Sequence, residues 1–543
     1  MPTIEISKKD LEMLVGKKLS IDELDKKAMP FVKADISEAQ GDALRLEIKD
    51  TNRPDLLSVE GIARELRGLY GKSLGLPRFK VYNGNVSVDV DPKLIGIRPR
   101  GAYAIAKNVK VTEHFLKQMI QLQEKICETF GRKRKEIAIG LFDYDKISGN
   151  LKYYAADPST KFVPLDFKEK LTLKEILELH PKGQEYGKLI SSFKKYPLLV
   201  DAKGEVLSMP PIINSDYSGK VTTRTRNLFI DITGFDQKII NTALDIVCAA
   251  LYDRGARIES VLVKYKDEQI LTPHMRPRKI KVPLSLIESI WGEKVASNRL
   301  KMFAAMKRMD CRINKGFMEV LYGSYRADIL HAVDIVEDLL IASDYNKLKP
   351  EKVLIPCRGA ELKERRDINA LREVCIGLGL QEVLTYTLTS KEKQSKYMLL
   401  SDADLVELEN PVSSEYSVIR KSILPELLSM LSKNKHREYP QKVFEVGKVV
   451  VKKNDDFEEK TLVSIAISHP KANFNEIKSI FDSICDSMGL KYKVEKTDQP
   501  SFEKGFCAIA KIDNKIAALG VVRREVLKNF GLEMPVAALE MEI

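Results

Sequence analysis

The sequence predicts an α+β protein built from several domains. The chain has 543 residues, and at roughly 150 residues per domain this length suits about three to four hydrophobic cores. Hydrophobic residues make up 44% of the chain and charged residues 31%, a balance that is typical of globular proteins rather than disordered chains. Helix-like spacing and strand-like alternation both occur throughout, so we expect helices and sheets in each domain.

The first domain is expected over residues 1–80. A strand is predicted in "LRLEIKD" (44–50), where apolar and polar residues alternate, and a helix that Ser58 caps follows it. The stretch from about 80 to 98 contains "NGN" and two prolines, and it is predicted to be a linker.

Three further domains are expected over residues 90–268, 270–347 and 350–543. The second is predicted to be a compact α+β domain with strands at 102–111, 136–142 and 227–233, a hairpin at 198–208, and helices at 112–130 and 238–255. The third begins at two prolines flanked by basic residues. The fourth alternates helices with strands that are expected to pair antiparallel.

Location and redox chemistry follow from what the sequence lacks. No apolar run approaches the roughly 18–20 residues needed to span a bilayer, and the first residues do not resemble a secretory signal. We therefore expect no membrane association and a cytoplasmic location. The seven cysteines are scattered and form no C-x-x-C pair, which argues against disulfides and a zinc site.

An excess of positive charge favours a polyanionic partner. The net charge is +12, from 89 basic and 77 acidic residues, and nucleic acid is the leading candidate, although a lysine-rich surface also serves solubility. Basic clusters at 131–135, 222–227 and 276–281 are compact enough to contact phosphates.

The stretch "YRADILHAVDIVEDLL" (325–340) concentrates carboxylates on a predicted helix over 327–343. Like charges three or four residues apart repel each other on a helix, so a cation is expected to offset them. The spacing leaves three interpretations open, namely a solvated face, a hard cation such as Mg²⁺, or contact with a partner's arginines. His331 is not expected to be a ligand, because hard cations prefer oxygen.

A candidate pocket is predicted around "NLFIDITG" and "LSMPPIINS". Asp231 and Thr233 lie on the same side of a strand, and the proline turn leaves Ser208 and Asn214 to present polar groups. These groups can bind a small polar ligand and position a water molecule. His180 is the only histidine between residues 115 and 273, so a Ser-His-Asp mechanism is disfavoured. The alternative is that Asp231 and Thr233 only satisfy a turn at a strand end.

Four blocks of sequence, taken together, resemble a known family. They are "NRPDLLSVEGIAREL" (52–66), "SMPPIIN" (208–214), "YRADILHAVDIVEDLL" (325–340), and "NPVSSEYSVIRKSILPELL" with "YPQKVFEVG" (410–447). Their order and content are similar to the β subunit of archaeal and eukaryotic-type phenylalanyl-tRNA synthetase, within the class II aminoacyl-tRNA synthetases. The resemblance extends over essentially the full chain.

The resemblance implies a partner, a substrate and a cofactor. In that family the β chain joins an α chain in an α₂β₂ enzyme that attaches phenylalanine to tRNA(Phe) with ATP and Mg²⁺, and the α subunit carries the synthetic site. Residues 350–543 then form a degenerate class II synthetase-like antiparallel-sheet domain. The arginine-bearing stretches that such a core uses to hold ATP are missing, so this domain is expected to support the subunit interface.

The resemblance also implies site residues. Residues 90–268 are expected to be an editing domain that hydrolyses tyrosine wrongly attached to the tRNA. Asp231 and Thr233 would recognise the tyrosyl group or orient water, Ser208 would help hold the terminal adenosine, and Leu199 and Asn214 would complete the pocket.

In the small third domain, expected to be winged-helix-like and to bind nucleic acid, the resemblance implies a magnesium site shared with the α subunit. Its ligands would be Asp328, Asp334, Glu337 and Asp338.

Two other functions remain open on the sequence alone. The chain can be a structural RNA-binding subunit with an inactive editing pocket. It can also be a DNA-associated protein, because the compact basic domain at 270–347 can resemble a winged helix. The tRNA footprint, the surface that reads the anticodon and the solubility of the β chain without α are not predictable from the sequence.

Overall fold

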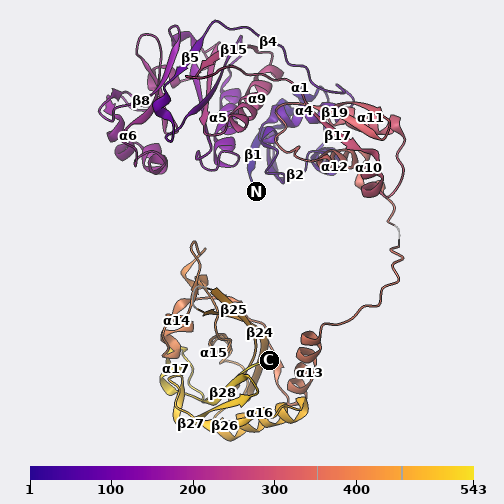
Figure 1. Cartoon of the computed structure of the whole chain (residues 1–543), viewed down its shortest axis with the longest axis vertical. Coiled ribbons are helices and arrows are strands. Elements are labelled where there is room, and N and C mark those ends of the chain that lie inside the picture. The colour runs from indigo at the N-terminus through magenta and orange to yellow at the C-terminus, as the bar shows by residue number, and fades with distance from the viewer. Residues whose placement is uncertain (351, 454–455) are drawn as a thin grey trace. The chain divides into compact units, whose positions relative to one another are not determined.

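The computed structural model describes residues 1–350, 352–453 and 456–543. The chain divides into two compact units, Met1–Glu351 and Lys352–Ile543. Both units combine helices with sheets, so the predicted mixed α/β architecture with several sheets is confirmed (Figure 1). Among the described residues, no helix combines the length and the apolar character needed to cross a membrane.

A three-stranded antiparallel sheet and its helices form the first part of the chain. The elements are β1 (Thr3–Ser7), α1 (Lys8–Val15), α2 (Ile21–Glu23), the π-helical turn η1 (Leu24–Ala28), α3 (Met29–Phe31), β2 (Ala34–Gln40), β3 (Ala43–Ile48) and α4 (Val59–Leu69). The strand order is β1-β3-β2, and Leu44, Leu46 and Ile48 of β3 are fully buried, as their alternation predicted. Ser58 caps α4 as predicted, because its hydroxyl accepts a hydrogen bond from the Gly61 amide.

An eleven-stranded sheet dominates the middle of the first unit. Its strands are β4 (Val81–Tyr82), β5 (Ser87–Val90), β6 (Arg100–Lys107), β7 (Ile137–Asp143), β8 (Leu151–Ala156), β11 (Tyr196–Val200), β12 (Val206–Met209), β13 (Ile213–Asn214), β14 (Leu228–Gly234), β15 (Arg257–Lys264) and β16 (Gln269–Thr272). The helices around it are α5 (Glu113–Glu128), α6 (Leu173–Leu179), α7 (Pro181–Tyr186), α8 (Asp216–Gly219) and α9 (Gln237–Asp253), and β9 (Lys161–Phe162) and β10 (Leu171–Thr172) form a separate pair. The predicted hairpin is confirmed, because β11 and β12 pair antiparallel.

The two ends of this sheet meet each other. The strand order runs β13-β12-β11-β8-β5-β15-β6-β14-β7, so β13 and β7 are the end strands of that path. The side-chain amide of Asn214 in β13 nevertheless donates a hydrogen bond to the Leu141 carbonyl of β7 at 3.4 Å. Tyr103 of β6 and Tyr153 of β8 share one core inside the curved sheet, while α5 and α9 pack on the other face of β6 and β14.

The linker predicted at residues 80–98 is wrong in part, because this stretch contains β4 and β5. β5 pairs in parallel with β15 and β8. Val88 and Val90 alternate with polar residues and lie in the core. Their two-residue period is that of a strand with one buried side, but the neighbouring glycines and prolines obscured it.

A small sheet with three helices completes the first unit. The elements are β17 (Arg278–Pro283), α10 (Leu284–Trp291), α11 (Ser297–Met306), β18 (Asp310–Asn314), β19 (Phe317–Tyr322) and α12 (Ala332–Ser343), and the sheet order is β17-β19-β18. The helix predicted over 327–343 begins five residues later, at Ala332, because His331 and Asp334 form a capping box there.

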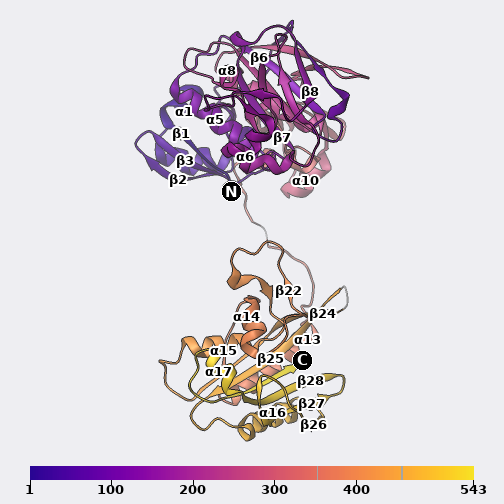
Figure 2. The ribbon, with the colours of Figure 1, turned by 90° about the vertical axis from the view of Figure 1, so that its left-hand side faces the viewer.

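The second unit is built on a seven-stranded sheet (Figure 2). The elements are α13 (Lys363–Gly377), β20 (Gln381–Glu382), β21 (Leu388–Thr389), α14 (Lys391–Gln394), β22 (Val406–Glu407), β23 (Val418–Ile419), α15 (Leu424–Lys433), β24 (Gln441–Lys453), β25 (Asp456–Ser468), α16 (Phe474–Met488), β26 (Lys493–Lys496), β27 (Phe502–Ile512), β28 (Lys515–Val522), α17 (Arg524–Asn529) and β29 (Val536–Glu542). The sheet order is β20-β24-β25-β29-β28-β27-β26, and every pair is antiparallel except β20 with β24. Helices α13 and α16 contribute to one core of this unit, and α15 and α17 to another.

Candidate functional site

Strand β14 carries two polar side chains into the interior of the large sheet. Asp231 and Thr233 are both buried, with 3% and 1% of their surfaces exposed. They lie on one face of the strand, because the alternating residues Ile230 and Ile232 belong to the core shared with α5 and α9 on the other face. The predicted orientation of Asp231 and Thr233 is therefore correct.

Asp231 lies against Ser208 of β12. The Ser208 hydroxyl donates a hydrogen bond to Asp231 Oδ2 at 3.4 Å, and Leu199 of β11 is the cross-strand neighbour of Ser208 and is fully buried. On the adjacent strand β7, Asp231 pairs with Gly140. A Cβ atom added to Gly140 would lie 2.2 Å from Asp231 Oδ1, so the carboxyl group occupies the space that a side chain would need.

Thr233 is held by Arg98. Arg98 Nε donates to Thr233 Oγ1 at 2.9 Å, and Arg98 Nη2 donates to the Thr233 carbonyl at 2.6 Å. Arg98 is itself buried and places a guanidinium group inside the sheet. The threonine hydroxyl therefore accepts a hydrogen bond from a buried cation.

The carboxyl group of Asp231 has a pKa near neutral pH. Burial raises the pKa of Asp231 from its ordinary value of 3.8 to about 7, and the Gly140 amide, the Ser208 hydroxyl and the charge of Arg98 offset only part of this effect. A carboxyl group with a pKa close to the working pH is suited to general acid–base catalysis. The pKa of Asp231 is therefore suited to a proton acceptor.

Of the predicted pocket residues, Asn214 alone lines a cavity of about 620 Å³, and Asp231, Thr233, Ser208 and Leu199 do not line it. Asn214 pairs with Ser208 across strands β13 and β12 and lines the cavity together with apolar and aromatic residues, including Leu165 and Phe167. Small-molecule sites commonly measure roughly 300–1,000 Å³ and combine an apolar lining with a few polar groups. The volume of the cavity lies within that range, and its lining combines apolar residues with several charged ones.

His180 lines the same cavity, but both of its ring nitrogens are engaged by the backbone. Nδ1 accepts a hydrogen bond from the Lys182 amide at 3.1 Å, and Nε2 lies 3.2 Å from the Leu165 carbonyl oxygen. His180 thereby caps α7 and does not activate Ser208.

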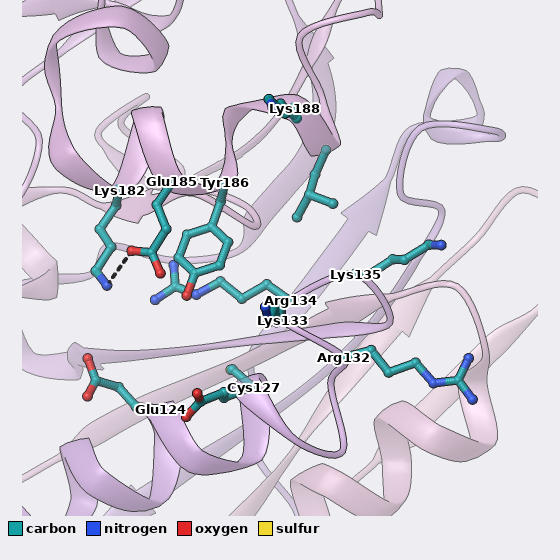
Figure 3. Close-up of a pocket in the computed structure, with 12 residues that line it drawn as sticks. Glu124, Cys127, Arg132, Lys133, Arg134, Lys135, Lys182, Glu185, Tyr186 and Lys188 are labelled. Atoms are coloured by element: carbon teal, nitrogen blue, oxygen red, sulfur yellow. Dashed lines mark hydrogen bonds and ion pairs between the residues drawn. The ribbon is translucent and has the colours of Figure 1, made fainter. Parts of the chain in front are cut away.

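A second cavity, of about 600 Å³, lies beside the first and is rich in basic side chains (Figure 3). Glu124, Arg134 and Lys182 line both cavities. Most of the basic residues of the second cavity come from the loop at 131–135 that follows α5. From its sequence, this loop was predicted only as one of three basic clusters able to contact phosphates.

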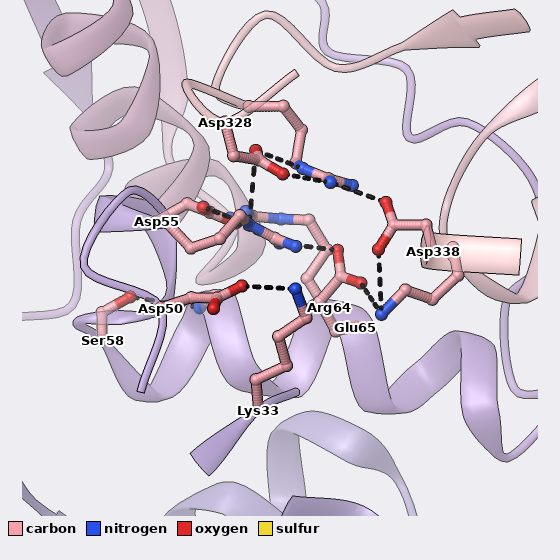
Figure 4. Close-up of polar contacts among 12 residues, drawn as sticks. Lys33, Asp50, Asp55, Ser58, Arg64, Glu65, Asp328 and Asp338 are labelled. Carbon is pink, nitrogen blue, oxygen red and sulfur yellow. Dashed lines mark hydrogen bonds and ion pairs between the residues drawn. The ribbon is translucent and has the colours of Figure 1, made fainter. Parts of the chain in front are cut away.

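Two of the four carboxylates predicted to bind magnesium are paired with cations (Figure 4); Asp338 is buried and Asp328 is partly buried. Arg326 donates to Asp328 at 2.8 and 2.6 Å and to Asp338 at 2.6 Å. Lys307 Nζ lies 3.3 Å from Asp338 Oδ1, and Arg53 Nε lies 3.7 Å from Asp328 Oδ1. Burial alone would raise the pKa of Asp338, but the positive charges of Arg326, Lys307 and Arg53 outweigh it and lower the pKa.

The other two carboxylates lie on the outer side of α12. Asp334 Oδ2 accepts hydrogen bonds from the amides of Leu330 at 2.8 Å and His331 at 2.7 Å, which closes the capping box. Glu337 Oε1 lies 2.8 Å from Lys33 Nζ. Each carboxylate of the acidic stretch thus has a partner within the chain.

Comparison with known proteins gives the family. Residues 354–543 match the model described as the phenylalanyl tRNA synthetase beta chain CLM domain, residues 116–259 match the B3/4 domain, and residues 280–345 match the tRNA synthetase B5 domain. A phenylalanine–tRNA ligase β subunit from Thermococcus gammatolerans is 44% identical over 561 residues, covering 100% of this chain and 98% of that protein. The Pyrococcus abyssi protein of the same name is 42% identical over 552 residues, covering 100% of this chain and 99% of the relative.

The chain belongs to the phenylalanine–tRNA ligase β-subunit family. A crystal structure of an N-terminal fragment of the phenylalanyl-tRNA synthetase β subunit from Pyrococcus horikoshii is 45% identical and superposes with a TM-score of 0.62. It covers 63% of this chain and 99% of the fragment. The resemblance inferred from the four sequence blocks is confirmed.

The acidic residues of this β-subunit family member do not fit a magnesium site. Mg²⁺ requires oxygen ligands in near-octahedral geometry around one point, whereas Asp328 and Asp338 bind arginine and lysine, Asp334 binds backbone amides, and Glu337 binds Lys33. In the part of the chain that the structure describes, no three or more His, Cys, Asp or Glu side chains gather in a way that could hold a metal ion. The cations that offset the acidic helix are the chain's own.

Sequence reasoning missed three residues near the site of this β-subunit family member. Arg98 and Arg134 each bond to segments that are distant in the sequence, and local periodicity does not reveal such pairs. The Tyr103 hydroxyl is buried and has no hydrogen-bond partner among the described residues. Only Arg134 had a sequence signal, because it lies in the basic cluster at 131–135.

Proposed function

We propose that the chain works with an α subunit in an α₂β₂ phenylalanine–tRNA ligase that uses ATP and Mg²⁺ to charge tRNA(Phe) in the cytoplasm. The support is the full-length similarity to proteins named phenylalanine–tRNA ligase β subunit. In this proposal the synthetic site lies on α, and the second unit of the β chain supports assembly.

We further propose that the first unit hydrolyses tyrosyl-tRNA. The observation that carries this proposal is the buried Asp231–Ser208 pair. Asn214, the cross-strand neighbour of Ser208, lines a cavity of about 620 Å³. Tyrosine differs from phenylalanine by one hydroxyl group, and an apolar pocket rejects such an analogue poorly, so a second hydrolytic site improves fidelity.

The proposed chemistry is attack of water on the ester that joins tyrosine to the terminal ribose. The ionised Asp231 accepts a proton from the water as the new carbon–oxygen bond forms. The ester bond then breaks, and the ribose oxygen leaves with a proton, giving tyrosine and free tRNA. Asp231 and Thr233 orient the water or recognise the tyrosyl group, Ser208 helps hold the terminal adenosine, and Leu199 and Asn214 shape the pocket.

Deacylation of tyrosyl-tRNA by the assembled enzyme tests this function. The wild-type enzyme should remove tyrosine faster than buffer, and Asp231→Ala should lose most of that activity. Asp267→Ala serves as the control, because Asp267 is an exposed carboxylate of the same unit. A flat time course for the wild type would favour a purely structural RNA-binding subunit, and full activity of Asp231→Ala would remove Asp231 from the site.

The division of labour between subunits has its own test, phenylalanine-dependent ATP–pyrophosphate exchange with α, with β, and with both. Exchange by the β chain alone would contradict the placement of the synthetic site on α. Salt-dependent binding to tRNA but not to duplex DNA would exclude the DNA-associated alternative.

A further inference from the structure

The loop at 131–135 has an unusual backbone. Arg132, Lys133 and Arg134 follow one another with φ of 48°, 55° and 64°, in the left-handed region that side chains other than glycine adopt rarely. Such a conformation persists only where the surrounding structure imposes it, and it is commonly associated with ligand binding. The sequence here places basic residues where glycine would be less strained.

Arg134 and Arg98 hold this loop against the candidate editing site. The Arg134 side chain donates hydrogen bonds to the carbonyls of Pro211 and Ile212 at 3.1 and 2.8 Å, and its guanidinium group lies 4.3 Å from the centre of the Tyr186 ring. Arg98, which binds Thr233, also donates to the carbonyl of Arg134 at 3.3 Å. The loop is therefore fixed to the segment that follows Ser208 and to the arginine behind Thr233.

The two lysines of the loop are free of ion pairs among the described residues. Arg132, Lys133 and Lys135 are exposed, and they line the cavity of about 600 Å³ with Lys188 (Figure 3). Arg132 lies 3.7 Å from Glu136, and Lys182 of the same cavity lies 3.0 Å from Glu185. Lys133, Lys135 and Lys188 form no ion pair with any carboxylate of the described residues.

The two cavities have complementary chemistry. The lining of one contains Asn214 and many apolar residues, and the lining of the other contains six basic residues and three glutamates. The two cavities share Glu124, Arg134 and Lys182. The end of an aminoacylated tRNA also has two chemically different parts. Its terminal adenosine carries the amino acid, and the preceding nucleotides carry phosphates. Single-stranded nucleic acid is commonly bound by a basic groove that follows its backbone.

We propose that the loop Arg132–Lys135, with Lys188, binds the phosphates of the single-stranded 3′ end of the tRNA and thereby places its terminal aminoacyl-adenosine in the adjacent cavity. This inference rests on the proposed editing function. Arg134 acts as a positioning residue, since its side chain is already committed to the carbonyls of Pro211 and Ile212.

The test compares two double variants in the assembled enzyme with tyrosyl-tRNA as substrate. Lys133→Ala with Lys135→Ala removes two free cations from the loop and keeps a Cβ atom at both positions, so the strained backbone is not relieved. Lys194→Ala with Lys195→Ala makes the same charge change at two exposed lysines of the same unit outside this cavity. Thermal unfolding of both variants confirms that each is folded.

We expect the loop variant to raise the KM for tyrosyl-tRNA about ten-fold and to leave kcat within about two-fold, because lost phosphate contacts weaken binding rather than chemistry. The slope of log(kcat/KM) against log salt concentration should become shallower by about 1.4, at about 0.7 for each lost single-strand phosphate contact. The control variant should match the wild type in both measurements.

The outcomes separate the two proposals. If the wild type hydrolyses tyrosyl-tRNA and the loop variant behaves like the control, the phosphate-binding role of the loop is wrong while editing stands. If the wild type does not accelerate hydrolysis, the editing function fails, and this inference fails with it.

Discussion

At the scale of single residues, Asp231 combines deep burial with a titration near neutral pH. Its carboxyl group has a serine hydroxyl on one side and a glycine on the opposing strand. Strand alternation and a proline turn in the sequence identified four candidate site residues, Asp231, Thr233, Ser208 and Asn214. Their contacts with Arg98 and Arg134 did not follow from the sequence, because these arginines reach the site through tertiary structure.

Asp231 should make the stability of the protein depend on pH. Its folded pKa of about 7 exceeds its ordinary value of 3.8, so its contribution to stability is full below about pH 4 and is lost as the pH rises through 7. Asp231→Asn keeps the shape of the side chain and removes its charge. Between pH 5 and pH 8 the free energy of unfolding of this variant should therefore rise by on the order of 2 kcal/mol relative to that of the wild type. Thermal unfolding at both pH values measures this, with exposed Asp267→Asn as the control. An equal effect at both pH values would contradict the shifted titration.

Gly140 should tolerate no side chain. In Gly140→Ala the new Cβ atom would lie 2.2 Å from Asp231 Oδ1 and 2.7 Å from the Phe142 ring, and crowding in a packed core costs roughly 1–3 kcal/mol. Gly377→Ala is the matched control, because nothing lies within 4 Å of a Cβ atom there. Denaturant unfolding should show a clear loss of stability for Gly140→Ala and none for Gly377→Ala. Equal unfolding curves for the two variants would argue against crowding at Gly140.

At the scale of elements, the sequence predicted the strands and helices whose patterns are regular. Strand β14 and helices α5 and α9 lie close to their predicted ranges. Strand β5 was missed among turn residues, and α12 begins later than its apolar spacing suggested. The helix start depends on the bonds that Asp334 makes to the preceding amides, and periodicity does not report such bonds.

Helix α12 should depend on Asp338 for its attachment to the rest of the unit. Asp338→Asn leaves Arg326 and Lys307 without their buried partner, and breaking a buried ion pair in this way costs roughly 3–5 kcal/mol. Glu337→Gln removes only a partly exposed pair with Lys33 and should cost less than about 1 kcal/mol. Chemical unfolding compares the two variants.

The pH dependence of this contribution is opposite to that of Asp231. Because the pKa of Asp338 is lowered in the folded state, its stabilisation is present above about pH 4 and is lost only as the pH falls towards the lower value. If Asp338→Asn and Glu337→Gln lowered the free energy of unfolding by the same amount, the buried ion-pair network would be contradicted. For each variant, the loss of stability measured in EDTA should equal the loss measured in Mg²⁺, because the partners of both carboxylates belong to the chain.

At the scale of the whole molecule, the two units have separate hydrophobic cores. The core around the large sheet and the N-terminal sheet lies within Met1–Glu351, and the cores around the seven-stranded sheet lie within Lys352–Ile543. The domain boundary expected from the sequence between residues 347 and 350 lies close to this break. How the three earlier domains combine into one unit could not be predicted, because it depends on long-range ion pairs such as Arg254 with Asp10.

The first unit should fold by itself. Residues 1–351 contain their own cores, and a crystallised fragment of the Pyrococcus horikoshii β subunit resembles this part of the chain. A fragment of these residues should unfold cooperatively and give dispersed NMR signals, and Asp338→Asn should destabilise it as in the full chain. A fragment that unfolds without a cooperative transition would contradict this account.

We propose above all that Asp231 serves as the base in hydrolysis of tyrosyl-tRNA. The pH–rate profile of that hydrolysis tests this role most directly. For the assembled enzyme, kcat should rise with pH and level off above an inflection near 7, because only the ionised carboxylate accepts the proton. Asp231→Asn should lower kcat by about 100-fold or more and abolish the inflection. A wild-type rate without an inflection between pH 5 and 9, or an unchanged profile in Asp231→Asn, would contradict the account.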